Sequence, residues 1–399
     1  MIYKLTLLFF FTFQIANAQN LDITIIVKDF ETNLPVDEVT ITAIKTKQGF
    51  LTNAEGKAVL HLTKPSDLEF VHSSYKTYIV KFSTLNKKEN VIYLEPVTQQ
   101  LEEVILTREH PQEILKQLVE KSKFRLTIPM SLKIYLREFY KKNDKMVFFN
   151  DGLLNFQILG DVKNIKSDIL VEQNRAVGLL DADIDANLLG YNLNNIIENY
   201  YQFKYLEEVL TNRAKKAYDF QVKTYLPNAA YLRIRIIPLD EIKGILSEFN
   251  VVYDPEKRLI MEITSQVTPS RLAEFKSTFL SSGEVFKLEF RNVFRMEDEI
   301  YYLANSKEVI GFEKKFKKEN RRIEVRNHMV VTHFDKKLFQ YDSHNIFKYK
   351  SLINKKTMVF SNYWDNDSGL LATAEEKEVI KLLASTDEEP QLDEIQSKE

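Results

Sequence analysis

Hydrophobic and polar residues alternate along much of the first hundred residues that follow position 20. Residues 39–43 alternate with a period of two, and residues 23–27 are rich in β-branched side chains, two patterns that predict β-strands. Further short strands are predicted at 59–62, 68–71, 77–80 and 91–94. Because no helical pattern separates these strands, the region predicts an antiparallel β-sandwich of about seven strands.

From residue 217 onward the alternation continues through longer segments. The predicted strands are 217–225, 231–237, 246–253, 259–265, 285–294, 299–303, 323–334 and 338–341. A long antiparallel sheet of this kind must curl, split or close. We therefore expect a larger curved sheet wrapped on a helix, an architecture like the half-barrel of periplasmic lipoprotein carriers.

Three segments have the 3.6-residue spacing of an amphipathic helix instead. They are residues 111–125, the stretch between Thr268 and Gly283, and the stretch that follows Thr373. The last of these begins with a capping box, in which Thr373 stands three residues before Glu376. The first helix is expected to dock on a neighbouring sheet and to link the two β regions.

The first twenty residues have the pattern of an export signal. Lys4 precedes an apolar run at 5–13, and Ala16 and Ala18 precede Gln19 in an A-x-A cleavage pattern. The apolar run is shorter than the roughly 20 residues that a membrane-spanning helix needs. No later segment is long and apolar enough, so the sequence predicts an exported mature chain without a transmembrane helix.

Composition excludes several functional classes. The 399 residues contain no cysteine, which removes disulfides, thiolate catalysis and cysteine-ligated metal sites. A formal net charge of −2 gives no electrostatic reason to bind nucleic acid. With 10 glycines against 27 Phe and 19 Tyr, the chain favours aromatic strands over a glycine-rich nucleotide-binding fold.

An ordered series of short motifs runs through the first β region. The motifs are VKD at 27–29, LTNAEGK at 51–57, LEFVHSSY at 68–75 and LEEVIL at 101–106. The series resembles the carboxypeptidase-like regulatory domain, over residues 21–106. This resemblance implies a transthyretin-like sandwich of the kind found at the N-terminus of Gram-negative envelope proteins and TonB-dependent receptors. That domain is an accessory module, so the resemblance implies no peptidase machinery.

Two histidine patterns are weak candidates for metal sites. His110 and Glu113 form an H-x-x-E pair, but Pro111 between them makes the start of a helix the better interpretation. His328 and His333 lie five apart in a predicted strand, a spacing that would send them to opposite faces. A zinc site needs a third protein ligand as well, so we expect neither a metal nor another cofactor.

Asp181, Asp183 and Asp185 have the spacing of the first ligands of a calcium loop. The sixth loop position is Ala186 rather than Gly, and the twelfth is Asn192 rather than Glu. Because the pattern fails at its diagnostic positions, a solvated acidic turn is the better interpretation. The sequence also contains no glycine-rich phosphate-binding motif and no H-E-x-x-H, so it predicts a non-enzymatic protein.

The strongest charged feature in the body of the chain is a basic run between residues 314 and 326. Its members are Lys314, Lys315, Lys317, Lys318, Arg321, Arg322 and Arg326. The simplest interpretation is a solvated hairpin. The alternative is contact with anionic lipid headgroups or lipopolysaccharide. Charge on both faces of this segment disfavours a third possibility, a small outer-membrane barrel.

The last forty residues contain the single tryptophan and an acidic end. Trp364 is interpreted as an anchor that packs the last predicted helix. Residues 385–399 carry many acidic side chains and few apolar ones, so this tail is predicted to be disordered.

The sequence thus predicts a mainly β, exported protein of the Gram-negative cell envelope. Its parts are a signal peptide at 1–18, a sandwich at 19–106, a helical linker at 107–130, a β-rich domain at 131–384 and the tail at 385–399. The favoured function is non-enzymatic binding or scaffolding, in the periplasm or at the outer membrane, with an envelope protein, a lipid or a glycan as partner. The alternatives are a carrier of lipid or another hydrophobic ligand, which needs a cavity lined by Phe and Tyr, and an enzyme with scattered site residues.

Overall fold

The structure is a computed structural model. It describes residues 21–86, 88–97, 102–178, 193, 200–274, 283–316, 319–348, 352 and 369–387. The described chain is mainly β, with large antiparallel sheets and few helices, as the sequence predicts. Residues 1–20, the three aspartates of the acidic turn and Trp364 lie outside the described residues, so the predictions made for them stay predictions.

Seven strands form the predicted sandwich from two small sheets. One sheet has the order β4 (Lys57–Leu62), β1 (Leu21–Asp29) and β7 (Glu89–Leu94). The other has the order β3 (Gln48–Leu51), β2 (Thr40–Ala43), β5 (Leu68–His72) and β6 (Tyr75–Val80). Alternate residues of β1 are buried in the core between the sheets, which explains its period of two. The sandwich is not wholly antiparallel, because β1 and β7 pair in parallel.

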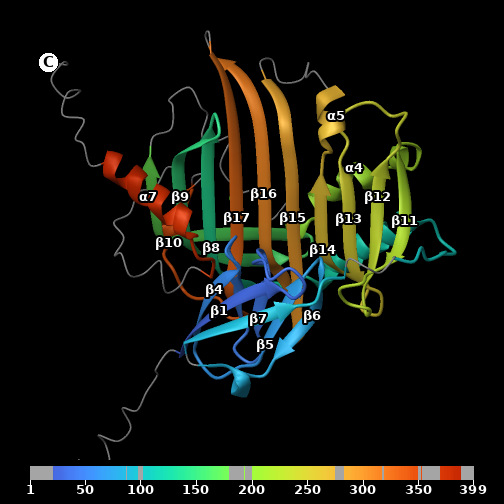
Figure 1. Cartoon of the computed structure of the whole chain (residues 1–399). Helices are drawn as coiled ribbons and strands as arrows, with labels where there is room; N and C mark the ends of the chain where they lie inside the picture. Colours follow the sequence, from blue (N-terminus) through green and yellow to red (C-terminus); the bar gives the residue numbers. More distant parts are fainter. Residues whose placement is uncertain are drawn as a thin grey trace, which may run out of the picture.

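Ten strands form one large antiparallel sheet with β10 and β11 at its edges. In chain order they are β8 (Met130–Lys142), β9 (Lys145–Asp161), β10 (Asn164–Gly178), β11 (Tyr218–Thr224), β12 (Leu232–Pro238), β13 (Glu248–Asp254), β14 (Leu259–Gln266), β15 (Gly283–Glu297), β16 (Ile300–Phe316) and β17 (Glu319–Asp335). Consecutive strands pair, except β10 and β11, which form the two edges; in addition, the last strand, β17, pairs with the first, β8 (Figure 1). This pairing joins the β8–β10 meander to the β11–β17 meander.

Several strands differ from the sequence-based prediction. The strands β9 and β10 were not predicted, and β16 continues far beyond the predicted 299–303. The middle of β9 is buried on both faces, so its apolar residues do not alternate with polar ones. Residues 338–341 form no strand.

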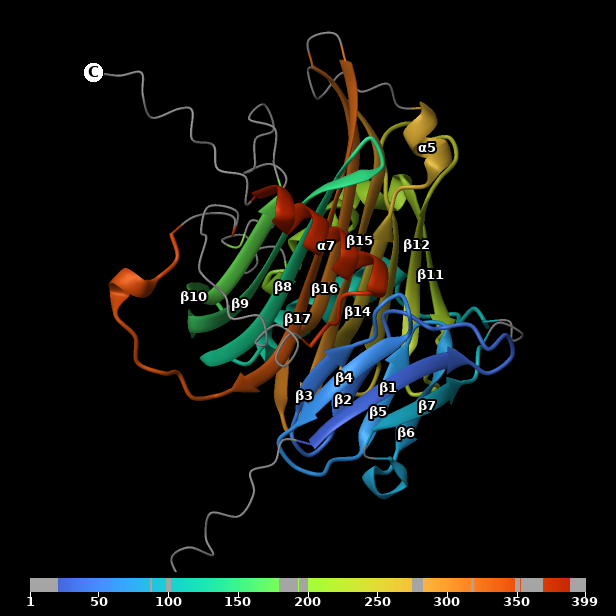
Figure 2. The same cartoon turned by 60° about the vertical axis from the view of Figure 1, so that its left-hand side comes forward.

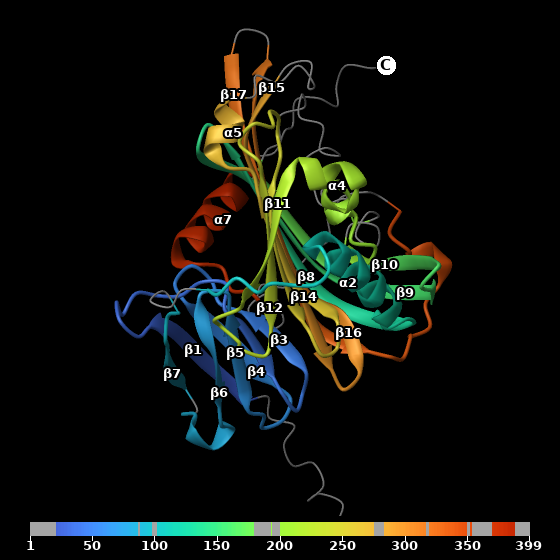
Figure 3. The same ribbon diagram turned by 90° about the vertical axis from the view of Figure 1, so that its right-hand side faces the viewer.

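Helices lie on both faces of the large sheet, and short 3-10 turns occur in both β regions. They are α2 (Pro111–Arg125), α4 (Glu207–Leu210), α5 (Pro269–Glu274), α7 (Ala374–Asp387), η1 (Phe82–Thr84), η4 (Lys204–Leu206), η5 (Asn212–Lys216) and η6 (Ser343–Asn345). Figure 3 shows α2 and α4 within the concave side of the curved sheet, and the sandwich with α7 on the opposite side. None of the helices in the described ranges is long and apolar enough to span a membrane.

Helices α2 and α7 begin where the sequence predicts them to begin. Helix α2 has the predicted bounds, and Thr373 and Glu376 form the predicted capping box, with N to Oε2 and N to Oγ1 distances of 2.9 and 3.0 Å. Helix α7 continues to Asp387, so the first residues of the predicted disordered tail are helical. Figure 2 shows α7 across the β8–β10 end of the sheet.

The largest core cluster fills the concave side of the sheet. Helix α2 contributes Leu115, Leu118 and Val119, and its Ser122 Oγ accepts a hydrogen bond from the Ile260 amide at 3.0 Å. Opposite the sheet lies a stretch of short turns, residues 200–217, which we call the cover segment. The predicted arrangement of a helix on a curved sheet is therefore present. The space between the helix and the sheet is filled by packed apolar side chains.

Candidate functional site

The four-stranded sheet of the sandwich rests on the face of the large sheet opposite α2. Strand β3 lies against β17, and a Cβ at Gly49 would come within 2.7 Å of the Val331 carbonyl oxygen, so only glycine allows this close approach. Asn305 Nδ2 donates to Thr40 Oγ1 at 3.2 Å. The Thr77 amide donates to the Pro227 carbonyl at 3.1 Å, which fixes the β11–β12 loop on the sandwich. The two β regions are thus joined along several strands.

Ion pairs with little exposure to solvent cross this junction. Glu38 of the sandwich lies between Lys307 and Arg291 of the large sheet, with an Arg291 Nη1 to Glu38 Oε2 distance of 3.5 Å. The same arginine binds Glu262 through Nε at 2.8 Å and Nη2 at 3.4 Å, a fork on one carboxylate. Although burial alone would raise the pKa of Glu38, Lys307 and Arg291 lower it to about 2. Removal of one partner would leave a buried charge uncompensated.

Two histidines lie beside this ion-pair cluster in their neutral form. Burial lowers the pKa of His328 to about 3, and burial with the nearby Arg291 lowers that of His72 to about 4. In the described chain no group of three or more Asp, Glu, Cys or His side chains could hold a metal ion. Both imidazoles are partly buried at this junction.

The expectation that His328 and His333 face opposite sides of their strand is wrong. A β-bulge interrupts the register of β17 between Val331 and His333. As a result His328 lies opposite Arg137 and His333 lies opposite Lys133. These two β8 positions are four residues apart and so share a face. The extra residue of a bulge could not be read from the strand's alternation.

Next to the ion pairs, the sandwich and the large sheet enclose a pocket of about 320 Å³. The sandwich contributes Ile44, Glu69 and Val71, the β11–β12 loop contributes Tyr225 and Tyr231, and strands β13–β15 contribute Val252, Met261, Arg295 and Glu297. Apolar and aromatic groups form the larger part of the walls, and the charged groups come from the β2–β3 turn, β5, β14 and the end of β15. We call this the junction pocket.

Two charged residues of the junction pocket have buried atoms without a partner in the structure. Arg295 donates through Nη1 to Glu69 Oε2 at 2.8 Å, but its buried Nε and Nη2 atoms have no hydrogen-bond partner. Glu297 accepts from the Tyr302 hydroxyl at 3.1 Å through Oε1, whereas its buried Oε2 has none. Burial raises the pKa of Glu297. Buried polar atoms are normally satisfied, so these three need explanation.

Two other arginines of the described chain use their Nε and Nη2 atoms to bind a carboxylate. Arg291 uses Nε and Nη2 to hold the Glu262 carboxylate. Arg175 uses the same two atoms on Asp151, at 3.1 and 2.6 Å. In Arg295 the equivalent fork of donors is buried and faces no acceptor. These two atoms have almost no surface that solvent could reach, so they are not open to the junction pocket.

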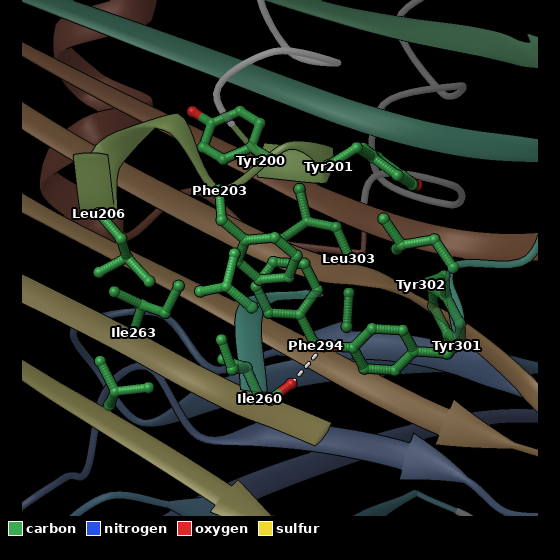
Figure 4. Packing of buried hydrophobic residues seen from close by; sticks show 14 of the residues in the cluster. Tyr200, Tyr201, Phe203, Leu206, Ile260, Ile263, Phe294, Tyr301, Tyr302 and Leu303 are labelled. Atoms are coloured by element: carbon green, nitrogen blue, oxygen red, sulfur yellow. Dashed lines mark hydrogen bonds between the residues drawn. The ribbon is translucent and has the colours of Figure 1, made fainter. Parts of the chain in front are cut away.

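The concave side of the sheet is filled by side chains in the part of the chain that is described. Figure 4 shows Phe203 of the cover segment beside Phe294, with ring centroids 5.1 Å apart, and Phe294 beside Tyr301, at 5.6 Å. The Tyr200 hydroxyl donates to Glu308 Oε1 at 2.8 Å, and the Tyr205 hydroxyl donates to the same atom. Burial raises the pKa of Glu308. The cover segment is thus held by aromatic packing and by the partly buried carboxyl of Glu308.

The residues singled out by sequence reasoning lie away from the junction pocket. The basic run belongs to the β16–β17 hairpin, which extends from the sheet away from the sandwich (Figure 1). Arg322 lies 3.8 Å from the centre of the Phe286 ring and pairs with Glu313, and Arg326 lies 3.8 Å from Glu324. Lys317 and Lys318 lie outside the described residues. Contact of this hairpin with an anionic surface stays a prediction.

The H-x-x-E pair is part of the start of α2, as predicted. His110 is the N-cap, and its Nδ1 accepts a hydrogen bond from the Gln112 amide at 3.1 Å. Glu113 pairs with Lys116 and Lys215, at 3.2 and 2.7 Å. Both side chains are engaged in local structure.

Sequence reasoning did not single out Arg295 and Glu297. One signal was present, because β15 carries charged residues at every second position from Lys287 to Glu297 except at 293. Such a strand has one apolar and one charged face, which normally indicates solvent exposure. Only the docked sandwich turns that face into a buried one.

Comparison with known proteins gives no family. No family model matches the chain, and no curated protein matches it. Among solved structures, lipovitellin, from a study of its lipid–protein interactions, is 11% identical with a TM-score of 0.28 and covers 59% of this chain. The chain spans only 29% of the lipovitellin chain.

Two bacterial structures are similarly distant. The LolA superfamily protein NE2245 from Nitrosomonas europaea is 8% identical with a TM-score of 0.22, covering 58% of this chain and 97% of its own. The Pseudomonas aeruginosa MucA/MucB complex is 8% identical with a TM-score of 0.18, covering 54% and 93%. Likenesses this low assign neither a fold family nor a function.

Proposed function

We propose that this chain is an exported binding protein of the cell envelope that holds a small, partly apolar ligand in the junction pocket. One observation carries the proposal: a pocket of about 320 Å³ lies between two docked β regions and combines apolar walls with charged side chains. Ligand pockets typically occupy about 300–1,000 Å³, occur at domain junctions, and combine apolar walls with a few polar groups. The junction pocket has these properties at the small end of the range.

The envelope location in this proposal rests on the N-terminal part of the chain. The predicted signal at 1–18 would export the protein. A seven-stranded sandwich follows at once, which is the fold that the resemblance to the carboxypeptidase-like regulatory domain implies. Fractionation of cells tests this part: the mature chain is expected in the envelope fraction, and an intact N-terminus in the cytoplasm would contradict it.

A binding role is proposed rather than catalysis, and one reason is that the two histidines beside the ion pairs are poor proton acceptors. An effective general base has a pKa close to the working pH. The pKa values of His72 and His328, at about 4 and 3, are too low for that role. The carboxylates of Glu69 and Glu262 are engaged by arginines.

A second candidate function is a carrier of lipid or another hydrophobic ligand on the concave side. The observation in its favour is the cover segment, a chain of short turns that separates an aromatic sheet surface from its surroundings. A lipid would have to take the place of side chains such as Phe203 and Leu206, which are fully buried there. The junction pocket needs no such displacement, so it is the favoured site.

Pocket-filling variants can test the proposed function and separate the two candidates. The mature protein is incubated with a lipid and small-molecule extract of bacterial envelopes, and retained compounds are identified by native mass spectrometry. V71W places a large ring at the junction pocket, and V91W is the matched control, because Val91 is 43% exposed on β7 of the other small sheet.

The proposal expects a compound that the wild type and V91W retain and V71W loses. A compound retained equally by all three proteins, and of lipid character, favours the carrier on the concave side instead. If the wild type retains nothing from the extract, the proposed binding function is wrong. Circular dichroism of each variant verifies that the fold is unchanged.

A further inference from the structure

We propose that residues 369–387 are a clasp that closes the sandwich onto the large sheet, and that release of this clasp lets the sandwich swing open. The clasp consists of the stretch 369–373 and helix α7. The inference concerns the movement of the two β regions and does not depend on the ligand of the junction pocket. It is carried by contacts that the clasp makes with both regions at one edge of their junction (Figure 2).

On the sandwich, the clasp pairs with the edge strand β3. The Leu51 amide donates to the Gly369 carbonyl at 2.8 Å, and Leu51 forms a parallel bridge with Leu370. At the start of α7, the Ala374 amide donates to Glu55 Oε1 at 2.7 Å. Because β3 ends its sheet, it presents backbone groups that no further strand of that sheet pairs. The clasp supplies a partner for this edge.

On the large sheet, one buried arginine holds the clasp. Arg137 of β8 is 4% exposed, and its Nη2 and Nη1 atoms donate to the carbonyl oxygens of Leu370 and Leu371 at 2.7 and 3.2 Å. Its Nε donates to the Tyr135 hydroxyl at 3.0 Å, and Nη1 lies 3.5 Å from Glu376 of α7. A buried guanidinium needs acceptors for its N–H groups. The clasp supplies two carbonyl oxygens and a carboxylate, which water replaces when the clasp leaves.

The opposite edge of the sandwich is attached without the clasp. Strand β6 lies at the other end of the four-stranded sheet, and its Thr77 amide donates to the Pro227 carbonyl at 3.1 Å. The chain that leaves the sandwich is fixed on the same side, because residues 103–105 pair with β11. Release of the clasp along β3 would leave these contacts in place as a hinge.

Little apolar surface holds the clasp in its closed position. Leu370 and Ile380 are its buried apolar residues within 369–385, at 4% and 8% exposed, whereas Leu382 is 65% exposed. A helix of 14 residues is marginal in water by itself, so α7 depends on its docking. Segments with few buried apolar contacts open at free energies below that of global unfolding. We therefore expect the clasp to open while the concave core stays folded.

Between the hinge and the clasp, ion pairs join Glu38 and Glu69 of the sandwich to arginines of β15. Charges that separate into water recover their hydration, which offsets much of the lost attraction. An apolar cluster also spans the junction, and it lies at the clasp. Its members are Leu51, Tyr135, Leu153, Val330 and Leu370. Removal of the clasp thus weakens the apolar contact at the edge that has to open.

Hydrogen exchange of the mature full chain, measured by mass spectrometry, tests release of the clasp. G369V disrupts it, because Gly369 has a φ of +65° and a Cβ there would lie 2.7 Å from Thr332 Cγ2. G244V is the matched control, since Gly244 also has a positive φ, of +128°, but a Cβ there meets no atom within 4 Å. L370S is a second clasp variant, which changes no residue of the sandwich or the large sheet.

Electron–electron resonance between two spin labels tests the swing. The chain has no cysteine, so K45C and K163C place the two labels uniquely. Lys45 is exposed on the β2–β3 turn of the sandwich, and Lys163 is exposed on the β9–β10 turn of the large sheet. The distance between the labels is measured in the labelled wild type, G369V, L370S and G244V.

We expect exchange in 369–387 to rise about tenfold or more in G369V and L370S, with β6 and β8 little changed. Both variants should also gain a population with a longer label distance, whereas G244V should match the wild type in both measurements. Faster exchange in 369–387 with an unchanged label distance would overturn the clasp, because the segment would then only cover the sheet. An equal rise in the exchange of β6 would overturn the hinge, because the sandwich would then detach as a whole.

Discussion

The two faces of the large sheet bury side chains of opposite character. On the concave face, α2 and the cover segment pack Leu, Phe and Tyr side chains into one continuous core. On the other face, the sandwich covers arginines and glutamates, several of which form ion pairs across the junction, together with two histidines and a pocket. Apolar packing is strong and tolerant of the exact partner, whereas buried ion pairs depend on geometry. The concave face therefore supplies stability, and the junction face supplies a specific arrangement of groups.

The largest effect is expected on the concave face. F203A removes a ring that is 1% exposed and stacks on Phe294. The lost burial and the cavity left behind should lower the free energy of unfolding by about 3–5 kcal/mol, measured by urea denaturation. A loss below about 1 kcal/mol would show that the cover segment is not part of the core, and would favour the carrier function.

On the junction face, a single and a double substitution should behave differently. R291M leaves Glu262, which is 6% exposed, without its partner and should cost about 3 kcal/mol of unfolding free energy. The double variant R291M/E262L removes both charges and should recover most of that loss. If the double variant is as unstable as the single one, the pair is not the source of the cost, and the contrast between the two faces weakens.

The pH dependence of stability should also belong to the junction face. In the unfolded chain His328 takes up a proton near pH 6.5, but in the folded chain its pKa is about 3. The unfolded state then binds more protons below pH 6.5, so stability falls as the pH drops from about 6.5. Each such group changes the free energy of unfolding by up to about 1.4 kcal/mol per pH unit.

H328Q should flatten this fall between pH 6 and 4, measured by urea denaturation at several pH values, while F203A should leave the slope unchanged. The pKa of Glu38 is lowered to about 2 in the folded chain, from about 4.5 in the unfolded chain. Glu38 therefore adds a further loss of stability as the pH falls below about 4.5. Equal slopes in H328Q and the wild type would place the acid sensitivity elsewhere.

The smallest expected effect concerns α7, which covers the β8–β10 end of the junction-side face. T373A removes the side chain that accepts from the Glu376 amide at 3.0 Å. The loss of this helix cap should cost about 1 kcal/mol in a thermal or urea unfolding experiment. T373S, which keeps the hydroxyl, is the control and should remain close to the wild type.

Much of the fold could be predicted because a strand or helix with one buried face has a regular pattern of apolar and polar residues. The alternation in β1 marks a strand with one buried face, and the capping box at Thr373 marks the start of α7. Where both faces of a strand are buried, as in the middle of β9, apolar and polar residues no longer alternate. The bulge between Val331 and His333 was also unpredictable, because one extra residue reverses the face of those that follow.

The candidate site was not predictable in the same way. Arg291, Arg295 and Glu297 have the spacing of a solvated strand face, and nothing local distinguishes them from the basic run further along the chain. Their burial comes from Glu38 and Glu69, which are more than two hundred residues away in sequence. The local sequence around a charged residue in a strand does not show whether another part of the chain will cover it.

Local sequence patterns were enough to predict the apolar content of the core, the absence of cysteine chemistry, most strands of the sandwich and the positions of α2 and α7. These features follow from local periodicity and capping, which depend on neighbouring residues. Long-range contacts set which face of the large sheet is a packed core and which is a junction with a pocket. That choice depends on the docking of the sandwich and the cover segment, since burial is a property of the covering surface as much as of the covered residue.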